Sequence, residues 1–364
     1  MKNATFRPAI QRQPSVAGRN QRCYIVAMVL HYEGRGIPLE EFGILIPANR
    51  SRARLILEAL RSHDDLAACE SEWLVHPDGS QVTREDVARV HSPEYVAKVF
   101  GDGAEEVIVQ VYELIDENGN YHRYDPSRAI RPLVDLFDDS LKWMAGSFQV
   151  GKEALTRGFC FNLGGGAHHA HYEFGHGFCI FNDIVTALRK LQAEGYIKTA
   201  WVIDVDAHKG DGTAALTRDD STIVTLSVHM AHGWPLDLPE HLPDGSLHPA
   251  YTPSDIDVPI DSGEEGDYVR RLSAALEMLD GYPRPDIAYV VDGADPYERD
   301  GLASTQVLRL SLDQMLERDM TIYSFLEERG IPQAYLMAGG YGDHAWEPYP
   351  RFLERVIRSR LQLS

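Results

Sequence analysis

The sequence predicts an α/β fold in which a mostly parallel central sheet carries helices on both faces, giving three layers. From Leu133 onward, short apolar runs typical of buried strands alternate with longer segments of helical spacing. Glycines and acidic or histidine residues follow several of these runs directly. Alternating strands and helices indicate a parallel sheet, and polar groups just after its strands are typical of the edge where such sheets build sites.

The individual elements follow from local periodicity. Six apolar runs are expected to be strands: Tyr24–His31, Phe159–Leu163, Thr199–Ile203, Thr222–Val228, Ile287–Val291 and Gln333–Met337. Six segments have helical spacing: Ser51–Ser62, Arg84–Phe100, Leu133–Thr156, Asp183–Glu194, Glu265–Leu279 and Ser311–Arg329. Asn182 or Asp183 is expected to cap the fourth of these helices.

Three stretches lie outside this regular pattern. Residues 1–22 are polar and rich in Arg, Gln and Asn, which predicts a loose N-terminal arm before a single domain over residues 23–364. Residues 101–131 contain the turn signal Glu117-Asn-Gly-Asn and are expected to form a surface excursion, either a lid or a contact arm. Residues 230–253 are rich in Pro and His, and they either shape the mouth of a pocket or form a surface loop.

Composition narrows the class of protein. The chain has 364 residues and a net charge of −20, which argues against nucleic-acid binding and is compatible with cationic substrates. Its four cysteines show no CxxC spacing, so they are expected to be reduced thiols in a cytoplasmic protein. No apolar segment resembles a signal peptide or a membrane span, so no membrane partner is expected.

The stretch Asp204-Val-Asp206-Ala-His208 is the strongest chemical signal. Alternate side chains of an extended chain point the same way, so these three polar groups should converge where the preceding strand ends. An acidic turn is the alternative interpretation. Asp206 and His208 suit zinc, and Asp295, at the end of another strand, would complete three protein ligands and leave a position open for water. Asp204 and Asp211 would then orient histidines or add oxygen ligands.

Two further patterns indicate acid–base and oxyanion chemistry. The adjacent pair His168-His169 follows three glycines at a strand end, and histidine titrates near neutral pH. His171 and His176 leave open a metal cluster of four histidines. Tyr341 lies between glycines after the last strand, where its hydroxyl could donate to a developing oxyanion.

The order His-His, Gly-Phe-Cys, Asp-x-Asp-x-His-x-Gly-Asp-Gly, Gly-Ala-Asp-Pro and Gly-Gly-Tyr resembles the zinc-dependent histone deacetylases of the arginase–deacetylase superfamily. The resemblance covers roughly residues 85–345, and it is strongest to class IV deacetylases and their bacterial relatives. It implies the arginase–deacetylase type of three-layer fold.

The resemblance also implies roles for single residues. Zinc would be held by Asp206, His208 and Asp295, where it would polarise the amide carbonyl and activate water. His169 matches the general base and Asp211 its orienting carboxylate.

The remaining catalytic and substrate-binding positions follow in the same way. His168 matches a deeper histidine paired with Asp204, and Tyr341 matches the tyrosine that binds the oxyanion. Gly177 and Phe178 match one wall of an acyl-lysine tunnel, and Trp234 is expected to supply the opposing wall. A structural K⁺ is common in the family, and its ligands here would include Asp204, Asp206, His208 and Ser227.

Two positions depart from the family pattern. The segment Ile46-Pro-Ala-Asn49-Arg50 replaces the usual His-Pro-x-Arg-like stretch, which puts the floor and rim of the site in doubt. The acidic rim residue that grips the substrate backbone in many relatives is not identifiable, and Asp125 is one candidate.

The function expected from these residues and from the resemblance is a zinc amidohydrolase that removes acyl groups from amines. The substrate would be an acyl-lysine protein or a small amine such as an acetylpolyamine, and the class IV resemblance adds long fatty acyl-lysine. Two alternatives are a binuclear manganese hydrolase of the arginase type, for which a second Asp-x-Asp pair near Asp295 is missing, and a non-catalytic acyl-lysine binder. The sequence does not determine the oligomeric state.

Overall fold

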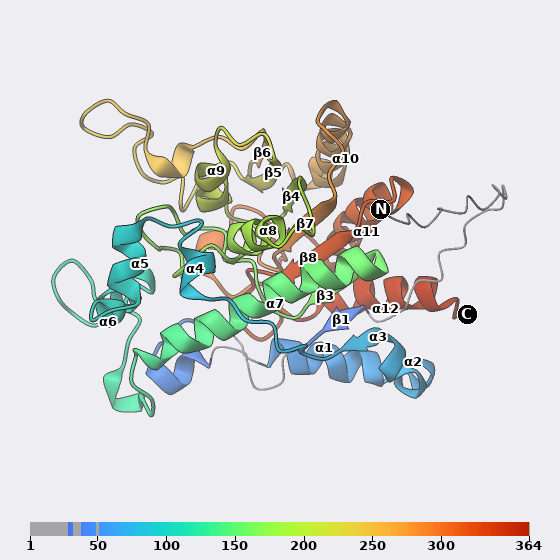
Figure 1. Ribbon diagram of the computed structural model, residues 1–364, viewed down its shortest axis with the longest axis horizontal. Coiled ribbons are helices and arrows are strands. Elements are labelled where there is room, and N and C mark those ends of the chain that lie inside the picture. Colours follow the sequence, from blue (N-terminus) through green and yellow to red (C-terminus); the bar gives the residue numbers. More distant parts are fainter. Residues whose placement is uncertain (1–27, 32–37, 49–50, 364) are drawn as a thin grey trace, which may run out of the picture.

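The computed structural model describes residues 28–31, 38–48 and 51–363. The expected N-terminal arm and the first part of the expected strand Tyr24–His31 lie outside the described residues. The described residues form one sheet of eight strands in the order β2-β1-β3-β8-β7-β4-β5-β6. Every neighbouring pair is parallel, which confirms the expected α/β architecture (Figure 1).

Five of the six expected strands lie where the apolar runs are, and in the described part of the sixth, Tyr24–His31, Val29 and Leu30 form a strand. The strands are β1 (Val29–Leu30), β2 (Leu74–Val75), β3 (Phe159–Asn162), β4 (Ala200–Asp204), β5 (Ile223–Met230), β6 (Ile256–Ile260), β7 (Ile287–Asp292) and β8 (Gln333–Met337). The sequence did not indicate β2 and β6, which are the two edge strands. Strand β2 has two residues, and β6 alternates buried and exposed side chains, so neither presents a continuous apolar run.

Successive residues of the central strands contribute to two separate hydrophobic cores. In β4, Trp201 and Ile203 belong to one core, whereas Ala200 and Val202 belong to the other. The first core is covered by α1 (Arg52–Arg61), α10 (Tyr268–Met278), α11 (Leu312–Glu328) and α12 (Pro348–Leu361), and the second by α5 (Pro93–Val99), α6 (Ala104–Val111), α7 (Asp135–Arg157) and α8 (Asp183–Ala193). The sheet is therefore the middle of three layers.

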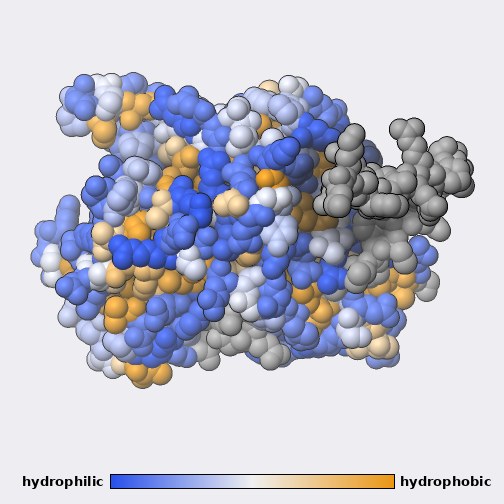
Figure 2. All heavy atoms as spheres, in the orientation of Figure 1, coloured by the Kyte–Doolittle hydropathy of each residue, from blue (hydrophilic) through white to orange (hydrophobic). Residues whose placement is uncertain are grey.

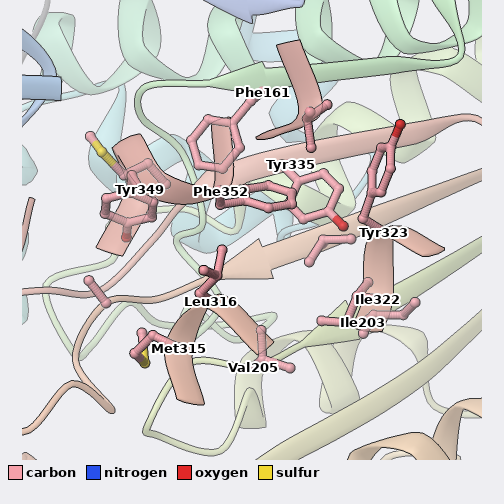
Figure 3. Close-up of a cluster of buried hydrophobic side chains, with 14 of the residues drawn as sticks. Phe161, Ile203, Val205, Met315, Leu316, Ile322, Tyr323, Tyr335, Tyr349 and Phe352 are labelled. Carbon is pink, nitrogen blue, oxygen red and sulfur yellow. The ribbon is translucent and has the colours of Figure 1, made fainter. Parts of the chain in front are cut away.

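Aromatic rings fill much of the first core. Phe161 and Tyr335 on adjacent strands stack at 5.8 Å between ring centroids, and Phe352 of α12 lies 5.3 Å from Tyr335 (Figure 3). These rings anchor α12 on the sheet. This helix was not predicted from the sequence.

The expected helix Arg84–Phe100 is wrong as a continuous element. The structure has α4 (Arg84–Val87) and a separate α5 that begins at Pro93. Proline lacks the N–H that an interior helical position needs, but it suits the first turn of a helix. The Ser92 side chain accepts a hydrogen bond from the Tyr95 N–H and so caps the new helix.

The excursion at residues 101–131 contains α6, and the rest is largely irregular. The turn signal is present: Asp116 accepts hydrogen bonds from the N–H groups of Asn118 and Asn120, and Gly119 has a φ of 81°. Glu113 and Arg123, on either side of this turn, line a cavity at the carboxyl edge of the sheet. The excursion thus reaches the candidate site.

The view in Figure 2 shows a largely hydrophilic surface on which hydrophobic residues are scattered in small groups. Among the described residues, every helix is too short or too polar to cross a bilayer.

Candidate active site

The candidate site lies where four adjacent strands end. Strands β3, β8, β7 and β4 are neighbours in the sheet, so the loops that follow them meet at one edge. These loops bring together eight residues singled out from the sequence: His168, His169, Asp204, Asp206, His208, Asp211, Asp295 and Tyr341. All of them are buried except Tyr341, which is half-buried.

Asp206, His208 and Asp295 form a compact group of ligand atoms. The Nδ1 atom of His208 lies 3.1 Å from Asp206 Oδ1 and 3.1 Å from Asp295 Oδ2. Burial and the charge of Asp206 raise the pKa of Asp295 to about 6. Burial favours the neutral ring of His208, but the two carboxylates outweigh it and raise the pKa of His208 to about 10. This site strongly favours a positive charge, and its one nitrogen and two oxygen donors suit a divalent metal ion.

Gly339, in the loop after β8, lies directly against the carboxylates of Asp206 and Asp295 with no side chain in between. The Gly339 N–H donates to Asp206 Oδ2 at 2.9 Å. A Cβ atom at Gly339 would lie 2.4 Å from Asp206 Oδ2 and equally close to Asp295 Oδ2, so only glycine allows this approach.

Behind the group, a buried arginine holds the two loops that carry it. Arg318 donates to the main-chain oxygens of Val205 at 3.0 Å and of Gly293 at 2.8 Å. Its guanidinium also pairs with Asp292 and Asp319, and all three side chains are fully buried. The role of Arg318 was not predicted from the sequence. The Arg-Asp pair lies in a helical segment, where it looks like part of a solvated face.

His168 pairs with Asp204. Its Nδ1 donates to Asp204 Oδ2 at 2.7 Å, and its Nε2 lies 3.7 Å from Asp206 Oδ1. Burial favours the neutral ring, but the charges of Asp204 and Asp206 outweigh it and raise the pKa of His168 to about 9.

His169 pairs with Asp211. Its Nδ1 donates to Asp211 Oδ1, also at 2.7 Å. Burial and the neighbouring His168 hold the pKa of His169 well below its usual value, although Asp211 opposes this shift. The alternative of a metal cluster of four histidines, which the sequence left open, is not the arrangement in the structure. His171 and His176 each lie 3.0 Å, through Nε2, from the second oxygen of Asp211.

Tyr341 is held from its main chain. Asp300 Oδ2 accepts a hydrogen bond from the Tyr341 N–H at 2.6 Å, and the Gly301 N–H donates to the main-chain oxygen of Tyr341 at 2.9 Å. Burial and the charge of Asp295 keep the pKa of the Tyr341 hydroxyl well above its usual range, so the group stays a donor. Asp300 was also missed, because a single acid in a polar loop carries no signal.

The candidate substrate-binding residues line a cavity of about 250 Å³ in front of His169 and His208. Gly177, Phe178, Trp234 and Tyr341 all contribute to it. Phe178 lies beside Tyr341 with ring centroids 6.2 Å apart, and Trp234 packs edge-on against His169 at 4.5 Å. Tyr112, from the end of α6, stacks against the Phe178 ring with a centroid separation of 6.0 Å.

Residues 46–355 match the histone deacetylase domain. The chain belongs to this family. Histone deacetylase 2 of Arabidopsis thaliana is 31% identical over 201 residues, which cover 55% of this chain and 49% of that protein. An uncharacterized protein of a Picosynechococcus strain is 30% identical over 203 residues, covering 56% and 62%. The acetoin utilization protein AcuC of Staphylococcus aureus is 28% identical over 329 residues, covering 86% and 76%. The chain therefore spans less than two thirds of the first two relatives. The histone deacetylase family is generally metal-dependent.

A second cavity of about 190 Å³ shares Gly177, Phe178 and Tyr341 with the first. Apolar side chains, among them Leu39, Ile46 and Met337, line much of it. Arg52 also borders it and donates to the main-chain oxygens of Ala338 and Gly339 at 3.1 and 3.2 Å. Arg52 was not singled out from the sequence, where the segment Ile46-Pro-Ala-Asn49-Arg50 was noted only as a departure from the family pattern, and residues 49 and 50 lie outside the described residues.

Three other expectations have structural outcomes. Asp125 accepts from the Ser127 N–H as a local cap and does not line the 250 Å³ cavity, which Glu113 and Asp237 do. In residues 230–253, Trp234 and Asp237 reach that cavity, whereas His241 is exposed. Ser227 is paired in register with Asp204, and its hydroxyl lies 3.0 Å from His229 Nδ1.

Cys179 is buried. Among the described cysteines no disulfide forms.

Proposed function

We propose that the protein is a zinc-dependent amidohydrolase that removes acyl groups from amines. The observation that carries this proposal is the contrast between two histidines beside one metal-suited group. His168 favours its protonated form and His169 its neutral form, although their bonds to carboxylates are equally short. Paired titratable groups whose pKa values are pushed apart are typical of acid–base sites.

Asp206, His208 and Asp295 would hold the zinc ion. Three protein ligands leave a coordination position for water or substrate, the arrangement of a catalytic zinc rather than a structural one. The bound ion would polarise the scissile carbonyl and lower the pKa of water.

His169 would be the general base. Its Nδ1 carries the proton that Asp211 accepts, so its Nε2 is free to take a proton from the attacking water. The same nitrogen would later give that proton to the nitrogen of the leaving amine. Because burial keeps the ring neutral, His169 is ready to accept a proton at neutral pH.

His168 and Tyr341 would stabilise the charge that develops on the carbonyl oxygen. Protonated His168 supplies a positive charge held in place by Asp204. Tyr341 supplies a hydroxyl donor. Its main-chain N–H and main-chain oxygen are held by Asp300 and Gly301. A preorganised donor of this kind contributes about 3 kcal/mol to transition-state stabilisation.

The substrate would be a linear acylated amine, either acyl-lysine in a protein or an acylated polyamine. The 250 Å³ cavity between Phe178 and Trp234 would take the alkyl stem. The carboxylate of Asp237 at this cavity suits an amine-bearing partner, whereas that of Glu113 already pairs with Arg123. The apolar 190 Å³ cavity beside Tyr341 favours acyl groups longer than acetyl as additional substrates.

A panel of acetyl-, butyryl-, octanoyl- and myristoyl-lysine peptides together with acetylpolyamines tests this proposal. We expect hydrolysis that is abolished by a chelator and restored by one equivalent of zinc. Tyr341→Phe should lower kcat on the order of a hundredfold. Chelator-insensitive turnover would contradict the zinc mechanism, and two manganese ions per chain would favour an arginase-type hydrolase instead.

A further inference from the structure

The carboxylate of Asp211 is surrounded by three histidines, of which the proposed mechanism uses one. His169 occupies Oδ1, while His171 and His176 share Oδ2, each at 3.0 Å. Asp211 is fully buried, so water does not compete for its oxygens. We propose that His171 and His176 are positioning residues which lock Asp211, and through it the general base His169, in the reactive arrangement.

The hydrogen bonds to Asp211 determine which ring nitrogen of each histidine carries hydrogen. An ionised carboxylate only accepts, and the three rings hold its pKa well below the usual value despite burial, so each ring must donate. His171 and His176 then carry hydrogen on Nε2, and His169 carries it on Nδ1. With both oxygens occupied, Asp211 cannot turn to offer His169 a different oxygen, and the opposite tautomer of His169 has no partner there.

His171 is itself held rigidly. Its main-chain oxygen accepts from Nδ1 of the buried His91, at 2.8 Å, and its N–H donates to the Phe174 oxygen. The Phe174 ring stacks on the His171 ring at 4.7 Å with an angle of 15° between the planes. His91 in turn accepts the Asn182 N–H through Nε2, which fixes its tautomer as well. Removing the His171 ring would therefore free one lone pair of Asp211 without moving the loop far.

His176 is the more exposed member. Its side chain is 28% exposed, whereas that of His171 is 5% exposed, and it packs against both Trp234 and Phe174 at 5.3 and 5.5 Å. It thus joins the cavity wall to the carboxylate. A substitution that keeps the ring but loses the N–H would test the hydrogen bond and leave the packing in place.

A divalent ion bound by His169, His176 and Asp211 is the competing interpretation, because their ligand atoms lie close together. The 2.7 and 3.0 Å separations are those of hydrogen bonds, and all three rings have an oxygen to donate to. An ion there would have to displace the hydrogens of His169 and His176, and it would remove the general base. We therefore favour the hydrogen-bonded network, and metal stoichiometry distinguishes the two.

The first experiment compares His171→Phe and His176→Phe with His171→Gln and His176→Gln in the zinc-loaded full chain. The kinetic results expected from these variants rest on the proposed function. The Phe variants should lower kcat about tenfold each with little change in KM, as expected for loss of a partner that orients an active-site group. The Gln variants, which keep an N–H donor, should recover most of the activity. His241→Phe, on the exposed loop, is the matched control and should leave kcat unchanged.

The second experiment does not depend on turnover. Long-range ¹H–¹⁵N correlation spectra of the imidazoles, in metal-free and zinc-loaded protein, should show His171 and His176 as Nε2–H tautomers and His169 as the Nδ1–H tautomer. In His176→Phe, we expect the His169 signal to show a mixture of tautomers.

Three outcomes would overturn the inference: Nδ1–H tautomers at His171 or His176, equal losses of kcat in the Gln and Phe variants, or a second equivalent of bound zinc that His176→Phe removes. Absence of turnover in the unmodified chain would instead contradict the proposed function, and the tautomer pattern would still decide this inference.

Discussion

Two histidine–carboxylate pairs lie side by side at the end of β3 and β4, and they behave in opposite ways. His168–Asp204 and His169–Asp211 have the same 2.7 Å separation, and the two imidazole centroids are 3.9 Å apart. The pKa of His168 is nevertheless raised to about 9, whereas that of His169 falls well below its usual value. A short bond to a carboxylate therefore does not determine the charge of a buried histidine.

The difference arises from what surrounds each pair. His168 faces a second carboxylate, Asp206, at 3.7 Å, so two negative charges outweigh its burial. Asp211 instead divides its charge among three rings, and His169 also feels the charge of His168. Once His168 is protonated, protonating its neighbour becomes harder. The pairing thus separates a charged residue from a neutral base within one dipeptide.

The largest expected effect comes from removing the His169 ring, and removing the His168 ring should cost less. His169→Ala should lower kcat on the order of 10³-fold, because a general base contributes about 10²- to 10⁴-fold. His168→Ala removes only a charge and should cost about tenfold to a hundredfold. Steady-state kinetics on the best substrate of the acyl panel would measure both. Equal losses would show that the two pairs do not have separate roles.

Replacing the carboxylate of Asp204 should change how turnover depends on pH. In the unmodified chain, turnover should fall as pH rises through about 9, because protonated His168 then loses its charge. Asp204→Asn removes one of the charges that raise this pKa, so the decline should begin at lower pH and kcat at pH 8 should drop about tenfold or more. A pH profile of kcat between 6 and 10 would measure the shift.

Asp211→Asn is the matched change in the other pair. An amide can offer the His169 ring a donor instead of an acceptor and so stabilise the wrong tautomer. A loss on the order of 10³-fold is expected. The decline near pH 9 should move less than in Asp204→Asn, because Asp211 contributes less than Asp204 to the raised pKa of His168. A shift as large as that in Asp204→Asn would contradict the separation of the pairs.

Most of these residues were predictable from the sequence because their signal is local. Asp204, Asp206 and His208 alternate after an apolar strand, and the His168-His169 pair follows three glycines. Partners contributed from distant segments were not predictable. Arg318 reaches the metal-suited loops from α11, Asp300 braces Tyr341 across 41 residues of sequence, and neither has a local pattern.

The fold shows the same limit. Central strands buried on both faces read as continuous apolar runs and were found, whereas the edge strands β2 and β6 were not. Helix boundaries failed at Pro93, where a proline and a serine cap outweighed the apolar spacing. The helix boundary at Pro93 is set by local residues. The short edge strands β2 and β6 depend on pairing with their neighbours in the sheet.

A smaller effect should come from crowding one pair alone. Gly177 has a φ of 57°, and a Cβ there would lie 2.3 Å from the Trp234 ring and 2.6 Å from the His169 ring. Gly177→Ala should therefore displace His169 and lower kcat about tenfold to a hundredfold. Gly195→Ala is the matched control, since Gly195 also has a positive φ, of 78°, but open space around it. If both variants lose activity equally, backbone strain rather than contact with His169 is responsible.

The smallest expected effect concerns a carboxylate that touches neither pair. Burial and the charge of Asp295 raise the pKa of Asp300 to about 7. The folded protein therefore binds the proton of Asp300 more tightly than the unfolded chain does. The stability that this group contributes is fully present below its unfolded pKa, near 4, and is lost as pH rises through about 7. Asp300→Asn abolishes this dependence, so the Tm of the variant relative to the unmodified chain should rise from pH 5 to pH 8 by about 2 °C.

The kinetic consequence of Asp300→Asn should be equally limited. The amide keeps one oxygen acceptor for the two N–H groups of Tyr341 and Leu302, so the brace on Tyr341 weakens without disappearing. We expect a few-fold loss in kcat, since one hydrogen bond to a charged group is worth about 1.5–3 kcal/mol and part of it is retained. The decline of turnover near pH 9 should not move, because His168 and Asp204 are untouched. Asp102→Asn, at an exposed turn, is the control for the thermal measurement. A shifted decline would mean that Asp300 acts on the His168 pair as well as on Tyr341.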